Sequence, residues 1–276
     1  MLDMLQDIRS DKRQQGDKTC EVDESTGDLH ALLVNGEKEI HFQEDLLFVQ
    51  TALQSIGFNS QNMVAISACA NNPLCAETKS PTIENLISTI NEFKETVKID
   101  DTFVLFVTSH GNFKRYRNGK IINYFFLGDK IVKDYGMERM LRGLDPNLGM
   151  HVYSCCYSGR FAELTGHGRN ISISSADLLS PCNGHYMRKI GVIFSRYFFG
   201  ALAGINIEGD LIQDPEYLSI EDAFDLASFK TAKYCMKHND KPDKPKMRWQ
   251  NADPSKLHIG LPLYIQDEQM LRAINL

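Results

Sequence analysis

A histidine and a pair of cysteines follow two apolar segments that have the length of buried strands. The segment at 103–108 ends two residues before His110, and the segment at 150–154 runs directly into Cys155 and Cys156. An imidazole beside a thiol can hold or deliver a proton for a thiolate nucleophile, which is the requirement for thiol catalysis. If the two strands are neighbours in a parallel sheet, both groups face one crevice beyond the carboxyl ends of the strands.

Small residues beside both strand ends favour a catalytic interpretation over a structural one. A cysteine after an apolar strand is commonly a small core residue, and a His-Gly pair is commonly a turn. Here Gly111 and the pair Ser158-Gly159 would also let backbone amides approach a substrate carbonyl. The combination predicts a Cys-His site.

Strand-like and helix-like segments alternate along the rest of the chain. Apolar runs of strand length lie at 29–34, 63–67, 103–108, 150–154, 171–175 and 257–263. Helical patterns lie at 44–57, 80–97, 133–144, 189–204 and 219–234. This alternation predicts an α/β fold with a mainly parallel sheet flanked by helices.

Capping and turn signals bound two of these elements. Ser80 can cap the helix that follows it, with Pro81 in the first helical position. Asn118-Gly119 stands between two strand-like halves and predicts a hairpin over 113–128.

The composition is that of an ordinary globular chain of 276 residues, 42% hydrophobic and 24% charged. A formal net charge of -6 gives no global basis for binding nucleic acid or an anionic membrane. Residues 1–28 are predicted to be a polar tail without a signal-peptide core, and no stretch reaches the ~18 apolar residues of a membrane helix. Seven cysteines, an odd number, favour a reducing compartment. We therefore expect a soluble, cytoplasmic protein without nucleic-acid or membrane partners.

Motifs for other chemistry are absent from the sequence. The chain has no HExxH, CxxC, GxGxxG or P-loop pattern, so we expect no metal and no cofactor. The Lys/Pro-rich segment 237–255 is interpreted as a solvated loop, with a substrate-contacting loop as the alternative. A solvated hairpin face is likewise expected for the basic strip of Lys114, Arg115, Arg117 and Lys120.

The sequence around these residues resembles the caspase, metacaspase and legumain clan of cysteine peptidases, most of all the legumain-like (asparaginyl endopeptidase) family. DDTFVLFVTSHG and GMHVYSCCYSG are similar to the two catalytic signatures of the clan, where one strand ends in His-Gly and the next in Cys-x-Ser-Gly. The Cys-Cys pair is similar to that of metacaspases, in which the second cysteine is the nucleophile. The resemblance therefore assigns Cys156 as the nucleophile. It extends over roughly residues 29–263, including a Gln-x-Asp pattern at Gln43 and Asp45.

This resemblance implies a single caspase-like three-layer sandwich at 29–276 that hydrolyses protein or peptide substrates without a cofactor. Cys156 would attack the peptide carbonyl, the amides of Cys156 and Gly111 would hold the oxyanion, and His110 would protonate the leaving amine. Two alternatives remain open. The same thioester could be captured by an amine, which makes a transamidase or peptide ligase, or the cleft could bind peptides without catalysis, as in a pseudoprotease.

The resemblance also implies which residues contact the P1 side chain of a substrate. The candidates are His41, where legumain has an arginine, together with Ser180 and Asp177. A neutral His41 with the Ser180 hydroxyl would suit Asn, and a protonated His41 would add Asp. A carboxylate of Asp177 in the pocket would select Arg or Lys. We expect Asn. Where the family has a histidine-orienting Asn, this sequence has Glu39, with Asn35 nearby.

Overall fold

The computed structural model of the chain describes residues 27–68, 75, 77–184, 190–206, 218–238, 243–250 and 254–255. The larger sheet consists of β1 (Leu29–Asn35), β2 (Met63–Ser67), β3 (Glu77–Lys79), β4 (Thr102–Thr108), β8 (Leu148–Ser154), β9 (Asn170–Ser174) and β10 (Lys246–Arg248). Its strand order is β10-β9-β8-β4-β1-β2-β3, and every pairing is parallel except that of β10 with β9. A smaller antiparallel sheet contains β5 (Gly111–Arg115), β6 (Ile121–Leu127) and β7 (Lys130–Lys133).

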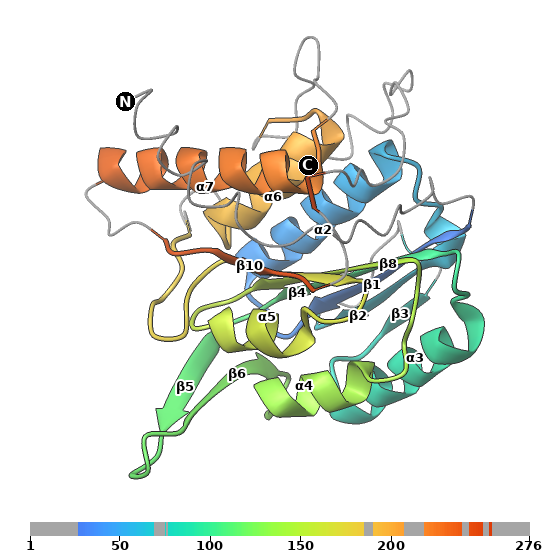
Figure 1. Cartoon of the computed structure of the whole chain (residues 1–276), viewed down its shortest axis with the longest axis horizontal. Coiled ribbons are helices and arrows are strands. Elements are labelled where there is room, and N and C mark those ends of the chain that lie inside the picture. Colours follow the sequence, from blue (N-terminus) through green and yellow to red (C-terminus); the bar gives the residue numbers. More distant parts are fainter. Residues whose placement is uncertain are drawn as a thin grey trace.

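Helices cover both faces of the larger sheet (Figure 1). One face carries α2 (Ile40–Ser55), α6 (Ile193–Ala203) and α7 (Ile220–Lys237). The other face carries α3 (Ile83–Thr96), α4 (Asp134–Leu141) and α5 (Gly159–Thr165), and a short 3-10 turn, η1 (Ser60–Asn62), precedes β2. The described residues thus form a three-layer α/β sandwich. This confirms the predicted fold class and is consistent with the caspase-like arrangement that the resemblance implies.

The central strands are buried on both faces because alternate side chains enter two separate cores. Ala31 and Leu33 of β1 pack into the core that contains residues of α2 and α6. Leu32 and Val34 of the same strand pack into the core that contains residues of α3, α4 and α5. Parallel strands that are covered on both faces have continuous apolar sequences, so such strands can be recognised in the sequence.

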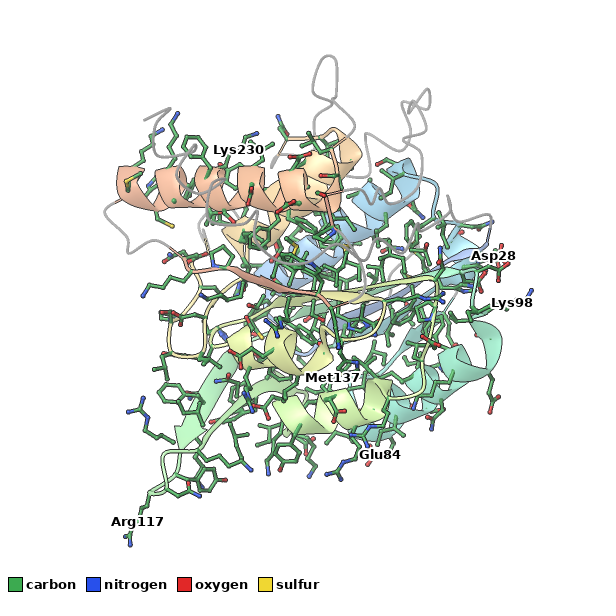
Figure 2. All side chains as sticks on the ribbon, viewed as in Figure 1. Asp28, Glu84, Lys98, Arg117, Met137 and Lys230 are labelled. Carbon is green, nitrogen blue, oxygen red and sulfur yellow. The ribbon has the colours of Figure 1, made fainter. Side chains whose placement is uncertain are left out.

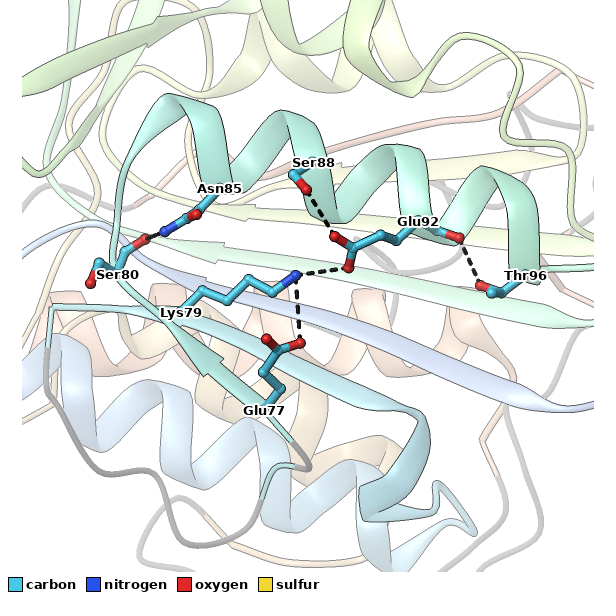
Figure 3. Close-up of polar contacts among 7 residues, drawn as sticks. All are labelled: Glu77, Lys79, Ser80, Asn85, Ser88, Glu92 and Thr96. Atoms are coloured by element: carbon cyan, nitrogen blue, oxygen red, sulfur yellow. Dashed lines mark hydrogen bonds and ion pairs between the residues drawn. The ribbon is translucent and has the colours of Figure 1, made fainter.

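The N-terminus of α3 differs from the prediction. The Oγ1 of Thr82, and not the hydroxyl of Ser80, accepts a hydrogen bond from the backbone N–H of Asn85, at 3.1 Å. The carbonyl of Ser80 instead accepts a bond from the Asn85 side chain at 2.9 Å (Figure 3). The helix begins at Ile83, two residues later than predicted, so Pro81 lies before the cap and Thr82 takes the capping role.

Short strands lie at positions where the sequence predicts a loop or no element. β3 follows β2 and is tied to α3 by Lys79, whose Nζ lies 2.7 Å from a carboxylate oxygen of Glu92 (Figure 3). β10 lies inside 237–255 and pairs with β9, so the loop prediction is wrong for these three residues. Such strands are too short to show a period of their own, and their pairing with a longer neighbour stabilises them.

The predicted hairpin is confirmed as β5 and β6. Gly119 has a φ of 80° at the turn, and the backbone N–H of Lys120 donates to the Oδ1 of Asn118 at 3.1 Å. Arg117 stands at the tip, which projects away from the rest of the molecule (Figure 2). The basic residues of the strip are exposed, as a solvated face requires.

A buried carboxylate joins α2 to the start of α6. Asp45 is fully buried and accepts hydrogen bonds from the backbone N–H groups of Gly191 at 3.1 Å and Val192 at 2.8 Å. It also pairs with the Nε of Arg196 at 3.0 Å. A side chain at Gly191 would collide with the Asp45 carboxylate. Asp45 of the Gln-x-Asp pattern therefore connects two helices of one layer.

Two predicted segments lie wholly or mostly outside the described residues. They are the polar tail at 1–28, of which only the last two residues are described, and the last strand at 257–263. Among the residues that are described, no helix has the length and apolar character needed to cross a membrane.

Candidate active site

Strand register brings His110 and Cys156 to the same edge of the larger sheet. β4 and β8 are neighbouring parallel strands, and their last register pair joins Thr108 to Ser154. His110 and Cys156 each come two residues after that pair. Two side chains that leave adjacent parallel strands at the same level emerge beside each other above the carboxyl ends of the strands.

Close backbone packing joins the two strand ends. A Cβ added to Gly111 would overlap with the carbonyl oxygen of Cys156, so only glycine allows this approach. Gly111 opposes Phe125 in the β5–β6 ladder, and the flanking bond runs from the N–H of Phe126 to the carbonyl of His110. This pattern makes Gly111 and Phe125 a non-hydrogen-bonded pair, in which backbone groups point away from the partner strand. The N–H of Gly111 is therefore not used by the ladder.

The turn after Cys156 is held by the loop that follows β9. Tyr157 has a φ of 57°, in the left-handed region that non-glycine residues rarely adopt. Its N–H donates to the carbonyl of Ser180 at 2.9 Å, and the N–H of Gly159 donates to the carbonyl of Asp177 at 3.4 Å. The ring of Tyr157 also packs against Phe113, with ring centroids 5.0 Å apart. These contacts hold the strained turn that presents Cys156.

Cys182, on the same loop, lies against the sulfur of Cys156. The two Sγ atoms are 3.5 Å apart, and the backbone N–H of Cys182 donates to the Cys156 Sγ at 3.4 Å. Hydrogen bonding from Cys182, together with the charge of His110, lowers the pKa of Cys156 to about 6 despite its burial. The same pairing and burial raise the pKa of Cys182 well above its usual range. The contact therefore favours the thiolate form at Cys156 and the thiol form at Cys182.

Cys155 has the opposite environment. Its side chain is fully buried in the core beneath α3, α4 and α5. Burial raises the pKa of this thiol above its usual range. A buried, protonated thiol is a poor nucleophile, so the environment favours Cys156 over its neighbour.

Two glutamates surround His110. A carboxylate oxygen of Glu37 accepts the backbone N–H of His110 at 2.9 Å and the Ser109 hydroxyl at 3.3 Å. Glu39 reaches the ring, with 3.5 Å between its Oε1 and the His110 Nε2. Phe42 packs edge-on against the imidazole, with ring centroids 5.0 Å apart. The backbone and the ring of His110 are thus each held by a separate carboxylate.

Asn35 contacts the backbone of Glu37. Its Oδ1 accepts the backbone N–H of Glu37 at 3.0 Å, and its amide donates to the hydroxyl of Ser67 at 3.5 Å. It therefore shapes the turn that carries the glutamates. Of the two candidates for orienting the histidine, Glu39 is the one that contacts the ring.

The predicted P1 residues lie on two sides of the site. His41 is buried beside His110, with ring centroids 6.3 Å apart, whereas Asp177 and Ser180 belong to the loop that holds the Cys156 turn. Burial, with the nearby His110, lowers the pKa of His41 even though Glu39 opposes this shift. The Asp177 carboxylate accepts the N–H of Leu179 at 2.8 Å and lies 3.8 Å from the Nζ of Lys244. Although burial opposes it, these contacts and bonds from Ser180 lower the pKa of Asp177.

Two groups of side chains have the composition of a metal site among the residues that the structure describes. Glu37, Glu39 and His110 form one, and Asp28, His30 and Asp101 form the other, with ligand atoms within 4.8 Å of one another in each. Neither group is predicted from the sequence. A divalent cation bound by Glu37, Glu39 and His110 would coordinate the His110 imidazole, which the thiol site needs as its proton carrier.

Alkylation should report the low pKa of Cys156 directly. We expect the rate of iodoacetamide reaction at Cys156, followed by mass spectrometry, to rise with pH through a midpoint of about 6, because only the thiolate reacts. Cys182→Ala removes the side-chain hydrogen bond to the sulfur and keeps the backbone one, so it should move the midpoint upward, part of the way toward the ~8.5 of an ordinary cysteine. Cys75, whose pKa burial raises to about 12, is the internal control and should stay unlabelled at neutral pH. An unchanged midpoint in Cys182→Ala would contradict this account.

Comparison with known proteins adds evidence on the fold. No family model matches the chain, and no curated protein matches its sequence. Among solved structures, the crystal structure of protein GSU0716 from Geobacter sulfurreducens is similar, with a TM-score of 0.56 and 12% sequence identity. The match covers 86% of this chain and 100% of that one. At this identity the similarity bears on the fold alone, and the name of that protein states no activity.

Proposed function

We propose that the chain is a cysteine endopeptidase of the caspase and legumain clan, with Cys156 as the nucleophile and His110 as the proton carrier. One observation carries the proposal. The neighbouring strands β4 and β8 end in register, each delivers one member of the pair, and Gly111 packs on the backbone of Cys156. A thiol serving only as a core residue would not need an imidazole at the same level of the next strand.

The reaction follows from the charges and donors around the sulfur. Since the pKa of Cys156 is about 6, the thiolate predominates at neutral pH and can attack a peptide carbonyl. The N–H of Gly111, which the ladder leaves unused, and that of Cys156 are the candidate donors to the oxyanion. His110 would then protonate the leaving amine, and water would hydrolyse the thioester. In this scheme Glu39 is a positioning residue, because it contacts the ring of His110 and not the reacting atoms.

The substrate preference that these groups support best is Asn at P1. Burial favours the neutral form of His41, which suits an amide side chain better than a carboxylate. The carboxylate of Asp177 is already engaged by Lys244 and by the amide of Leu179, which weakens the case for selecting Arg or Lys. Asn therefore remains the proposal, with Asp and then basic residues behind it.

Electrophilic peptide probes that differ only at P1 test the proposal. We expect an acyloxymethyl ketone peptide with Asn at P1 to label Cys156 faster at pH 7 than its Asp, Arg or Lys counterparts, because binding at P1 aligns the electrophile with the thiolate. Intact-mass and peptide analysis locate the adduct, which Cys156→Ala should abolish. His41→Ala should reduce the preference for Asn over Arg.

The same measurement separates the other functions. A preference for Arg or Lys that disappears in Asp177→Ala would replace the Asn assignment with a basic one. If no peptide probe labels Cys156 although iodoacetamide alkylates it normally, the chain is a peptide-binding module, and the peptidase proposal is overturned. For a chain that is labelled and turns over, product analysis with an added amine distinguishes ligation from hydrolysis.

A further inference from the structure

The contact between Cys156 and Cys182 pairs two cysteines from different segments of the chain. Cys156 follows β8, whereas Cys182 belongs to the loop after β9. Both are free thiols with 3.5 Å between their sulfurs, and Cys182 is partly buried against the core of α2, α6 and α7. A disulfide has an S–S length of about 2.05 Å, so a closure of roughly 1.5 Å would join the pair.

The element that carries Cys182 can accommodate this movement. The residue lies in an irregular segment, so no ladder bond of the sheet has to break when its sulfur approaches. The anchors of the Cys156 turn, by contrast, are the carbonyls of Asp177 and Ser180, earlier in the same loop. Asn183 is held to Asp243 at 2.9 Å just after Cys182, so the closure falls on the side chains of the two cysteines and leaves the anchors of the turn in place.

Cys155 cannot take the place of Cys182, although it is the neighbour in sequence. Its side chain enters the core on the α3–α5 side of the sheet, away from the sulfur of Cys156. Adjacent residues at a strand end point to opposite faces, which separates their sulfurs. Proximity in the fold thus selects a partner 26 residues away along the chain.

We propose that Cys156 and Cys182 form a reversible disulfide when the protein meets a hydroperoxide, and that Cys182 thereby protects the Cys156 sulfur from irreversible oxidation. In the first step the Cys156 thiolate attacks hydrogen peroxide, the O–O bond breaks, and a sulfenic acid and hydroxide form. In the second step Cys156 is a neutral sulfenic acid, so its negative charge no longer raises the pKa of Cys182. The Cys182 thiolate attacks the sulfenic sulfur, the S–O bond breaks, and the oxygen leaves as water with the Cys182 proton. The two thiols lose two electrons, and the peroxide gains them. Thiol reductants reverse the reaction.

The consequence for activity rests on the proposed function, but the disulfide itself does not. A sulfur bound to Cys182 cannot attack a carbonyl, so oxidation would switch the site off until a thiol restores it. Without Cys182, the sulfenic acid would persist and react with further peroxide to the sulfinic acid, which thiols do not reduce.

Peptide mapping of the oxidised full chain tests the inference. The protein is treated with hydrogen peroxide, blocked with N-ethylmaleimide and digested with trypsin, which places Cys156 in 143–160 and Cys182 in 170–188. We expect these peptides to be joined, at a mass two hydrogens below their sum plus one N-ethylmaleimide on Cys155, and to separate on treatment with dithiothreitol. Cys182→Ser should lose the link and accumulate Cys156 sulfinic acid that dithiothreitol does not remove. Cys155→Ala is the matched control and should retain the link.

Each outcome has a defined meaning. Sulfinic acid at Cys156 in the wild-type chain with Cys182 still reduced, or a link that disappears in Cys155→Ala, would overturn the inference. Because the readout is a mass, a chain that forms the link but is not labelled by any peptide probe would refute the peptidase proposal and leave the thiol pair intact. A chain that is labelled but forms no link would do the reverse.

Discussion

Peptide cleavage should disappear in Cys156→Ala, and His110→Ala should lose at least ~10³-fold in kcat/KM. The first variant removes the atom that forms the thioester, and the second removes the group that protonates the leaving amine. Both side chains lie beyond the ends of their strands and outside the two cores, so the melting temperature should change little. Fluorogenic peptide hydrolysis and thermal unfolding, measured on the same preparations, check both statements.

Cys155→Ala provides the matched control, since it removes a thiol one residue away from the nucleophile. We expect this variant to keep its activity and to lose some stability, because the Cys155 side chain is fully buried and its removal leaves a small cavity. An inactive Cys155→Ala beside an active Cys156→Ala would show that the nucleophile is assigned to the wrong cysteine. Activity in all three variants would remove the basis for a Cys-His peptidase.

The largest effect on stability is expected from Asp45→Ala. This substitution leaves Arg196 without its buried counter-charge and the amides of Gly191 and Val192 without their acceptor. Removing one member of a buried, hydrogen-bonded ion pair costs about 3–5 kcal/mol. We expect the free energy of unfolding, measured by urea denaturation, to fall by about this amount.

Glu163→Ala is the control for that measurement. Glu163 forms an ion pair with Arg160 at 2.9 Å, and the two side chains are 45% and 42% exposed. Exposed pairs of this kind contribute about 0–1 kcal/mol, so the variant should unfold almost like the wild type. Equal effects of the two substitutions would mean that Asp45 does not connect the helices as its contacts indicate.

The parts of the fold that the sequence predicts are those with an unbroken apolar run. β1, β4 and β8 are buried on both faces, and their composition alone shows it. His110 and Cys156 could be proposed as a pair for the same reason, because both follow such strands. Thr82 as the cap of α3 could not be, since Ser80 and Thr82 are both capping residues and the sequence does not choose between them. The strand β10 could not be either, since it depends on the edge that β9 offers.

The surroundings of the site were harder to predict than its two central residues. Cys182 and Glu37 reach the site through loops, and no periodicity relates a loop residue to the strand end that it contacts. The signal available for Cys182 was its residue type alone, which seven positions share. Asn35 and Glu39 could be placed near the histidine only by the resemblance, and contact geometry was needed to distinguish between them.

Because β4 and β8 pair directly in the sheet, the position of His110 beside Cys156 does not depend on the chain that connects the two strands. Seven register pairs hold these strands side by side, whereas the chain between them runs out through the hairpin of β5 and β6 before it returns. The pair is therefore kept together by the sheet and not by the length of that connection. At the hairpin tip, a Cβ added to Gly119 would meet no atom within 4 Å. Insertions, or even a break in the polypeptide, are tolerated best at such exposed tips, so this part of the chain is free to diverge in length without moving the reacting groups.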